Sequence, residues 1–182
     1  MQIELIETER LRGERISQSH WKLWMSMGSN LEVMATLGGI WSQEQAQEKL
    51  QWNCEQWQRY GHGQWIFFAK KTGLFVGRGG IREMTVNGNE EIELGYALMP
   101  GYWGRGLATE IGKKALSIAF EQFHYPSVVC FTLVDNKRSE RVMQKIGFAF
   151  EGQILHAGLP HVLYRYHNPK LELQSAVGRD DK

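Results

Sequence analysis

A glycine-rich turn directly before a helix is the segment of this sequence best suited to bind an anion. The stretch 101–106 holds three glycines and Arg105, and it leads into apolar residues at helical spacing from Leu107. The first N–H groups of a helix lack partners within the helix, and the helix dipole adds partial positive charge there. Glycines let a ligand approach these donors, and Arg105 adds a formal charge. The turn indicates a phosphate or pyrophosphate site, with tight strand–helix packing as the alternative.

Two common phosphate-binding loops do not fit this turn. A P-loop ends in glycine-lysine-serine or threonine, whereas Gly106 is followed by Leu107 and Ala108. The dinucleotide-binding fingerprint follows the first strand of a βαβ unit, but here three strands joined by short turns are expected before the glycines. Both nucleotide-binding interpretations are therefore disfavoured.

Carboxylates and histidines elsewhere in the chain can transfer protons. Glu91 and Glu93 share one face of a strand predicted over 90–98, because side chains alternate along a strand. His156 and His161 lie around the last predicted pair of strands, and histidine titrates near neutrality. Each of these residues also has a structural interpretation, as a solvated carboxylate or as a surface or packed histidine.

The elements that must position these residues follow from hydrophobic periodicity and capping signals. Residues 3–16 alternate in character and predict one strand, and Ser17 or Ser19 can begin a helix that runs to about Gly28. Ser42 with Gln45 forms a capping box for a second helix that ends at 61–63. The remaining elements are expected as strands at 64–70, 74–84, 90–98, 127–134, 148–155 and 161–167 and as helices at 107–123 and 136–145.

Length and charge limit the class of protein. The chain has 182 residues and a net charge of +1, from 21 basic and 20 acidic residues, so a nucleic-acid-binding function is not expected. Its two cysteines have no paired spacing, so neither a disulfide framework nor a cysteine-based metal site is expected. No signal peptide or membrane-spanning run is recognised. We expect a cytoplasmic protein with one domain over 1–168, a flexible tail over 169–182, and no metal.

The glycine turn and a second motif resemble the GNAT acetyltransferase superfamily, in the branch typified by bacterial ribosomal-protein N-terminal acetyltransferases. The superfamily loop, Gln/Arg-x-x-Gly-x-Gly/Ala, is similar to 103–108, Trp-Gly-Arg-Gly-Leu-Ala, where Trp103 takes the first place. The stretch 135–148 resembles the branch pattern Asn-x-x-Ser-x-x-x-x-x-Lys-x-Gly-Phe, and 8–11 and 74–77 fit its first strand and central hairpin. The resemblance runs from about Glu7 to Tyr166.

This resemblance implies an α+β fold: a central, mostly antiparallel mixed sheet of about seven strands, splayed between strands 4 and 5, with about four flanking helices. Acetyl-CoA is implied as a co-substrate between the strands at 90–99 and 127–134. Unpaired backbone groups near Leu98 and Met99 would bind the pantetheine amides, and an N–H near Leu98 would stabilise the oxyanion. The implied cofactor-binding residues are Leu98, Met99, Trp103, Gly104, Arg105, Gly106, Leu107, Ala108, Thr109, Asn136 and Ser139.

The implied reaction is direct transfer of an acetyl group to a primary amine. An ammonium group is not nucleophilic, so a base must remove its proton, directly or through a water. Glu93 is the first choice for this base and Glu91 the second. His156 and His161 are further alternatives, because their region borders the substrate cleft in this family.

The departing thiolate needs a hydrogen bond or a proton. The branch offers Ser139, which is a poor acid and is expected to stabilise the sulfur. Asn136 is expected to bind the cofactor and to cap its helix. A tyrosine does the acid's work elsewhere in the superfamily, but the corresponding positions here hold Met143 and Gln144.

The acceptor is not determined by these motifs, because loops form its walls. A protein N-terminus and a small amine both stay open, as do a monomer and a homodimer. An acidic cleft built from Glu90, Glu91 and Glu93 would favour polyamines or cationic peptides, and 34–41 is expected to form one substrate wall. A non-catalytic acyl-CoA-binding module is the alternative function, against which the joint presence of Glu93, Asn136 and Ser139 argues.

Overall fold

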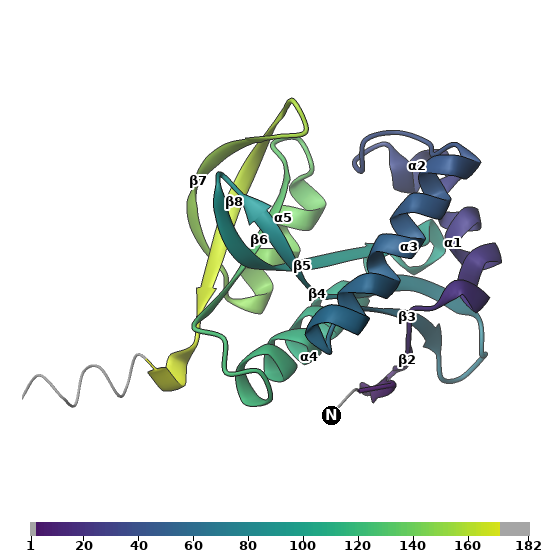
Figure 1. Ribbon diagram of the computed structural model, residues 1–182, viewed down its shortest axis with the longest axis horizontal. Helices are drawn as coiled ribbons and strands as arrows, with labels where there is room; N and C mark the ends of the chain where they lie inside the picture. Colours follow the sequence, from purple (N-terminus) through teal and green to yellow (C-terminus); the bar gives the residue numbers. More distant parts are fainter. Residues whose placement is uncertain (1–2, 172–182) are drawn as a thin grey trace, which may run out of the picture.

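Eight strands form one mixed sheet in the described part of the chain, residues 3–171 of a computed structural model (Figure 1). The order across the sheet is β1-β2-β3-β4-β5-β6-β8-β7, and the β5–β6 pair is parallel whereas the other neighbours are antiparallel. The strands are β1 (Leu5–Glu7), β2 (Leu11–Arg15), β3 (Gln64–Ala69), β4 (Phe75–Val86), β5 (Asn89–Leu98), β6 (Ser127–Leu133), β7 (Ala149–His156) and β8 (Leu159–His167).

The prediction of one strand over 3–16 is wrong in one respect, because these residues form a hairpin of two strands, β1 and β2. The turn is closed by Thr8, whose N–H donates to Leu11 O at 2.9 Å and whose hydroxyl accepts from Leu11 N–H at 3.0 Å. Threonine side chains that bond to the nearby backbone in this way favour turns over continuous strands. The predicted α+β class and the splayed mixed sheet are confirmed, and the extra strand moves the splay to the β5–β6 boundary.

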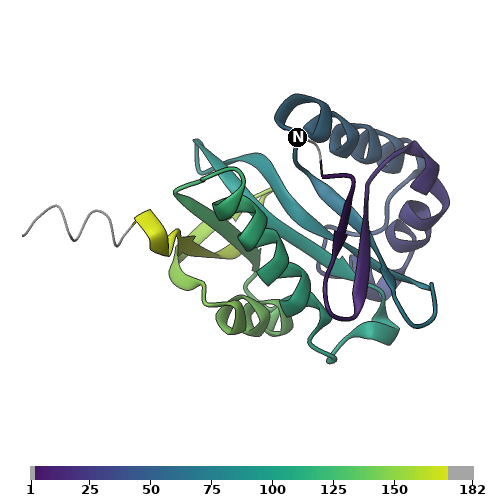
Figure 2. The same ribbon diagram turned by 90° about the horizontal axis from the view of Figure 1, so that it is seen from below.

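Five α-helices cover the two faces of the sheet in residues 3–171 (Figures 1 and 2). Arg78 lies over the ring of Trp24 in α1, whereas a Cβ on its neighbour Gly79 would meet Ile111 of α4. Successive residues of a strand face opposite sides, so α1 and α4 lie on opposite faces. None of these helices is long and apolar enough to cross a membrane. The helices are α1 (Trp21–Gly28), α2 (Leu31–Met34), α3 (Gln43–Tyr60), α4 (Leu107–Glu121) and α5 (Lys137–Ile146).

The helix ends follow the capping signals. Ser42 N–H donates to Gln45 Oε1 at 3.0 Å and Gln45 N–H donates to Ser42 Oγ at 3.2 Å, so the predicted capping box of α3 is confirmed. Gly61 and Gly147 end α3 and α5 with left-handed φ angles of 74° and 113°. Ser17 precedes a short 3₁₀ turn, Gln18–His20, that leads into α1.

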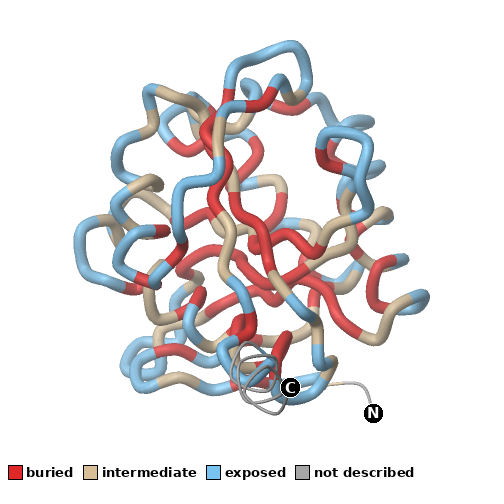
Figure 3. The backbone as a smooth tube through the Cα atoms, turned by 90° about the vertical axis from the view of Figure 1, so that its left-hand side faces the viewer, coloured by how far each residue is buried: buried red, intermediate tan, exposed pale blue. Residues whose placement is uncertain are grey.

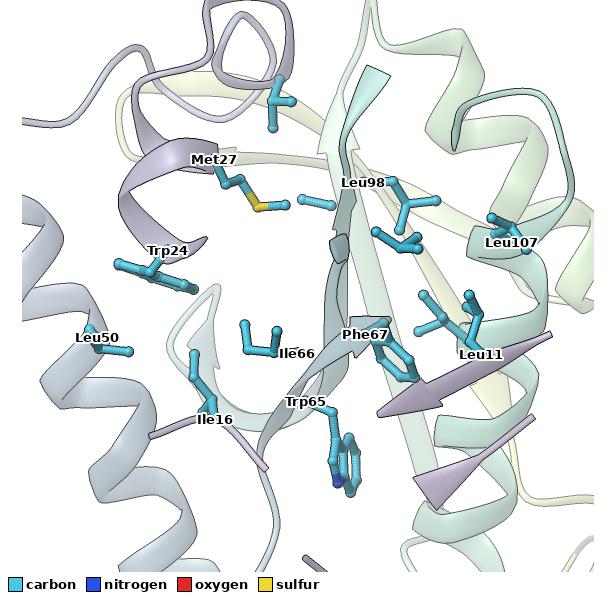
Figure 4. Packing of buried hydrophobic residues seen from close by; sticks show 14 of the residues in the cluster. Leu11, Ile16, Trp24, Met27, Leu50, Trp65, Ile66, Phe67, Leu98 and Leu107 are labelled. Atoms are coloured by element: carbon cyan, nitrogen blue, oxygen red, sulfur yellow. The ribbon is translucent and has the colours of Figure 1, made fainter. Parts of the chain in front are cut away.

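Apolar side chains fill both sides of the sheet. Figure 4 shows Ile66 of β3 on the side of Trp24 and Leu50, whereas its neighbour Phe67 points toward Leu11. Figure 3 shows that the buried residues are concentrated in the middle of the molecule. The chain after β8 is tied to the residue before β6, because Asn168 N–H donates to Pro126 O at 2.8 Å. Most of the predicted tail, 172–182, lies outside the described residues.

The pairing of Gly77 with Leu98 sets the path of β5 toward the glycine turn. A Cβ at Gly77 would lie 2.2 Å from Ala97 O and 2.8 Å from Leu98 Cα, and these backbone atoms cannot move independently. We expect Gly77→Ala to lower the free energy of unfolding by about 1–3 kcal/mol, measured by urea denaturation. Gly152→Ala is the control, because a Cβ at Gly152 meets nothing within 4 Å. Equal stability of the two variants would contradict this close approach.

Candidate active site

A cleft of about 1610 Å³ opens where β5 and β6 part. These parallel neighbours share one register pair, Glu93 with Val129. Beyond that pair β5 continues along β4 while β6 continues along β8, and the two halves of the sheet diverge (Figure 1). Residues from both layers of helices line the cleft, among them Trp24 of α1 and Ser139 of α5. The cleft therefore passes through the sheet.

The glycine turn forms one end of the cleft. Gly104 and Gly106 have left-handed φ angles of 73° and 77°, which residues with a Cβ rarely adopt. A Cβ at Gly104 would meet nothing within 4 Å, and one at Gly106 would approach only Arg10, at 3.6 Å. The start of α4 is thus open to a ligand. The predicted cofactor-binding residues that line the cleft are Leu98, Trp103, Gly104, Gly106, Leu107, Ala108, Thr109, Asn136 and Ser139.

Arg105 and Met99 are the two predicted residues that do not line the cleft. The Arg105 guanidinium lies over the ring of Tyr102, at 5.8 Å from its centroid, and the side chain is exposed. Cations that do line this end come from α5, where Arg138 lies 5.2 Å from the ring centroid of Trp103. The sequence pattern did not reveal that α5 supplies these cations. A basic residue in a polar helix is usually solvated, and nothing near Arg138 in the sequence indicated a contact with Trp103.

Hydrogen bonds from the N-terminal hairpin hold the glycine turn and the start of α4. Arg10 donates from its backbone N–H to Glu110 Oε1 at 2.8 Å, from Nε to Glu110 Oε2 at 2.7 Å, and from Nη1 to Arg105 O at 2.9 Å. The Thr8 hydroxyl also donates to Glu110. Although partial burial acts to raise it, these hydrogen bonds hold the pKa of Glu110 below its ordinary value. The first turn of α4 is thereby tied to the β1–β2 hairpin.

The backbone at the end of β5 is more fully bonded than expected. Met99 N–H donates to Val76 O at 2.9 Å, Met99 O accepts from Tyr102 N–H at 3.0 Å, and Leu98 O accepts from Trp103 Nε1 at 2.7 Å. The prediction that these groups are unpaired is wrong, because the turn after β5 folds back onto them. Since bonding alternates along a strand and Met99 faces β4, the Leu98 N–H faces the gap beside β6.

The three predicted acidic residues of β5 have different surroundings. Glu93 lines the cleft, is 4% exposed, and accepts a hydrogen bond from Arg82 Nε. Glu91 accepts from Arg165 Nη2 at 2.7 Å, and Glu90 accepts from Thr85 Oγ1 at 2.9 Å; neither lines the cleft. The three glutamates therefore do not form the acidic cleft that would favour polyamines, because Glu90 and Glu91 face other partners.

His156 and His161 both line the cleft, and each ring packs against the ring of Phe131. Their ring centroids lie 5.5 Å apart. Partial burial, together with the neighbouring His161, lowers the pKa of His156 below its ordinary value. His161 Nδ1 lies 2.9 Å from Leu159 O, a contact in which Nδ1–H donates, so Nε2 is the basic nitrogen of the neutral ring.

Ser139 meets a tyrosine that the sequence patterns did not single out. The Ser139 and Tyr96 hydroxyls lie 2.9 Å apart, and both residues line the cleft. Burial, chiefly, raises the pKa of Tyr96 well above its ordinary value, so it stays a hydrogen-bond donor at neutral pH. Asn136 caps α5 by accepting from Ser139 N–H at 3.2 Å, as predicted. Tyr96 alternates onto the apolar face of β5, so its local pattern was that of a core residue.

The segment before α3 lies along the opposite side of the cleft. Leu37, Ile40 and Trp41 are among its lining residues. Trp41 packs on Trp24, with ring centroids 5.0 Å apart, which anchors the segment to α1. The stretch predicted as a wall therefore does border the cleft.

Comparison with known proteins agrees with this geometry. The acetyltransferase (GNAT) domain model matches residues 10–149. The Bacillus subtilis (strain 168) uncharacterized protein YkkB is 29% identical over 133 residues, 73% of this chain and 77% of its own. An acetyltransferase structure from Agrobacterium tumefaciens str. C58 has a TM-score of 0.80 at 24% identity, covering 92% of this chain and 96% of that one. RimL, a ribosomal L7/L12 alpha-N-protein acetyltransferase solved with coenzyme A, has a TM-score of 0.74 at 19% identity, covering 90% and 98%. Because the matched family domain spans the glycine turn, the parted strands and α5, the chain belongs to the GNAT acetyltransferase family.

Proposed function

We propose that this protein is an acetyl-CoA-dependent N-acetyltransferase that transfers the acetyl group directly to a primary amine. The observation that carries the proposal is the cleft through the sheet, because it joins an open helix N-terminus to a buried carboxylate. Acetyl-CoA enters from the side of α4 and α5, and the amine from the side of α1, α2 and α3. Membership of the GNAT family supports acetyl transfer, and the coenzyme in the RimL structure supports acetyl-CoA as the donor.

The phosphate end is built from the start of α4 and the cations of α5. The N–H groups after Gly104 and Gly106 bind the diphosphate, since the space beside Gly104 is open and only Arg10 lies near Gly106. Arg138 and Arg141, which line the same end, add positive charge. The bound coenzyme supplies the acetyl thioester, and the Leu98 N–H donates to the developing oxyanion.

Glu93 removes a proton from the acceptor amine in this proposal. Its Oε2 is held by Arg82, and Oε1 makes no hydrogen bond to the described residues. The carboxylate is thus oriented at the point where β5 and β6 part, beside the thioester. His156 and His161 are the alternatives, because both line the cleft and His161 presents a basic Nε2.

Ser139 and Tyr96 act together on the departing sulfur. A serine alone is a weak acid. In this proposal the Tyr96 hydroxyl, which also lies 3.2 Å from the Ser139 carbonyl oxygen, donates to Ser139 Oγ, and a hydroxyl that accepts from one neighbour donates more strongly to another. Tyr96 therefore takes the place of the tyrosine that α5 lacks: Met143 is fully buried and Gln144 donates to Tyr164. The acceptor is a protein N-terminus or a small amine.

Acetyl-CoA and CoA should both raise the melting temperature of the protein, because each binds the folded state. Gly106→Val should weaken acetyl-CoA binding at least about tenfold, since a side chain blocks the approach to the helix N-terminus. Isothermal titration calorimetry measures the affinity. Gly73→Val is the matched control, because Gly73 has a similar φ of 69° and an open Cβ position outside the cleft. Equal acetyl-CoA affinities of the two variants would show that the phosphates bind at another site.

Glu93→Gln should lower kcat about 100-fold or more near neutral pH, because an amide cannot accept the ammonium proton. The rate is measured by release of the CoA thiol, and an unchanged shift in melting temperature with acetyl-CoA shows that the coenzyme site is intact. Glu91→Gln, on the same strand but outside the cleft, should have little effect on kcat. If Glu93→Gln turns over normally, a histidine or a water is the base; if no amine is acetylated by the wild type, the protein is a non-catalytic acyl-CoA-binding module.

Tyr96→Phe should lower kcat about 10- to 100-fold while the acetyl-CoA affinity stays unchanged, because the lost hydrogen bond acts on the charged leaving group. Single-turnover measurements separate this step from product release. Tyr102→Phe is the control, since the Tyr102 hydroxyl makes no hydrogen bond to the described residues although the residue also lines the cleft. A normal rate in Tyr96→Phe would leave Ser139 to act alone.

A further inference from the structure

A buried arginine without a carboxylate partner lines the cleft on its α1–α3 side. We call this part of the lining, formed by Arg78, Arg82 and Glu93, the floor of the cleft. Arg78, in the middle of β4, is 8% exposed and lines the cleft. Its Nη1 donates to Gln64 Oε1, and its guanidinium lies 5.3 Å from the ring centroid of Trp24, the α1 residue that projects toward the sheet in Figure 4. Arg78 Nε is buried and has no hydrogen-bond partner, and no carboxylate of residues 3–171 forms a salt bridge with this side chain.

This arrangement is costly for the folded protein alone. A buried guanidinium needs an opposite charge or hydrogen-bond acceptors to offset its lost hydration. Burial, and secondarily the neighbouring Arg82, lowers the pKa of Arg78 to about 9, so the group still carries its charge at neutral pH. Gln64 neutralises none of that charge. Nε and Nη2 therefore both lack an acceptor among the described residues. Nε is fully buried, so Nη2 is the nitrogen that can donate to a ligand in the cleft.

The rest of the floor does not balance the charge of Arg78. Arg82 and Glu93 form an ion pair and so cancel, and Arg82 is also held at 5.4 Å from the ring centroid of Trp52. Other charges of this side, Glu32, Glu48 and Lys49, line the cleft but are exposed, where water and salt screen them. The buried floor thus carries one excess positive charge, and a polyamine would add to it.

Gly95 brings Arg78 and Glu93 within reach of one small ligand. This glycine lines the cleft, and a Cβ there would lie 2.8 Å from Gln64 Nε2 and 3.7 Å from Arg82 Cζ. Gln64 is the partner of Arg78, and Arg82 is the partner of Glu93, so the two groups converge over the same residue. An acceptor that spans them lies along β5 from Ala97, which pairs with Arg78, to Glu93.

We propose that the acceptor is a small primary amine that also carries a carboxylate, with the carboxylate on Arg78 and the amine at Glu93. This inference rests on the proposed N-acetyltransferase function and narrows its acceptor to amino-acid-like molecules. The carboxylate accepts from Arg78 Nη2, which is neither bonded to Gln64 nor fully buried, and it supplies the missing charge. An oxygen ligand there also holds the acceptor so that its amine faces the parted strands.

The test compares acceptors in matched pairs with the full-length protein. β-Alanine, γ-aminobutyrate, methionine and glutamate are each paired with the carboxamide of the same amino acid, and spermidine is added as a cation. We expect kcat/KM to be about 10- to 100-fold higher for the preferred acid than for its carboxamide, the range for a hydrogen bond to a charged group. The α-carboxamides have the less basic amines, which favours them chemically, so a preference for the α-amino acids reports recognition.

Variants assign the preference to Arg78. In Arg78→Met the acid-to-carboxamide ratio should fall to near one, and Arg78→Lys should keep part of it, because a point charge remains without the planar guanidinium. Lys49→Met is the control: it removes an exposed cation from the same cleft, and the ratio should stay at the wild-type value. A preserved rise in melting temperature with acetyl-CoA shows that the Arg78 variants are folded.

A binding measurement keeps the inference testable if no amine of the panel is acetylated. N-acetylated amino acids should raise the melting temperature of the CoA-bound wild type, and this shift should be lost in Arg78→Met. Spermidine or the carboxamides as the better acceptors, an unchanged ratio in Arg78→Met, or no stabilisation by any N-acetylated acid would overturn the inference while leaving the proposed function intact. Failure of acetyl-CoA and CoA to bind would instead refute the proposed function, and the same acids would then be tested without coenzyme.

Discussion

The separation of β5 from β6 is the constraint on which the rest of this structure depends. After the single pair of Glu93 and Val129, each strand keeps only its other neighbour, so the sheet opens in the middle. Backbone groups that face such an opening need other partners. The turn after β5 supplies one, because the indole of Trp103 donates to Leu98 O, and the Leu98 N–H still faces the gap. A packed sheet would offer no interior space with polar groups on both sides.

Contacts between distant segments hold the two ends of this opening in position. The N-terminal hairpin bonds to the first turn of α4 through Arg10 and Glu110 and to the glycine turn through Arg105 O, which stabilises both. On the other side, Ser139 is held by the cap of α5 and by Tyr96. Functional groups that are held in this way need little reordering when a ligand binds. Arg78 differs from them, because its surroundings orient its charge without neutralising it.

Much of the fold and the glycine turn at the end of the cleft could be predicted from the sequence. Capping and turn chemistry act over three or four residues, so the Ser42–Gln45 box, the Asn136 cap and the Gly147 terminus were each legible in short stretches. Alternation along β5 correctly separated Glu93 from the apolar face. The local pattern of residues 3–16 did not reveal that Thr8 turns the chain, which gives the sheet its eighth strand.

The sequence by itself determined which residues begin and end the helices, which glycines leave a helix N-terminus open, and which face of each strand can be polar. Only the tertiary structure decided which polar groups meet. Glu90, Glu91 and Glu93 look equivalent along the chain, yet Glu91 forms an ion pair with Arg165 and Glu93 forms one with Arg82. Tyr96 reaches a serine 43 residues away. Such pairings depend on sheet order and on helices packing from both faces, whereas local patterns extend only a few residues along the chain.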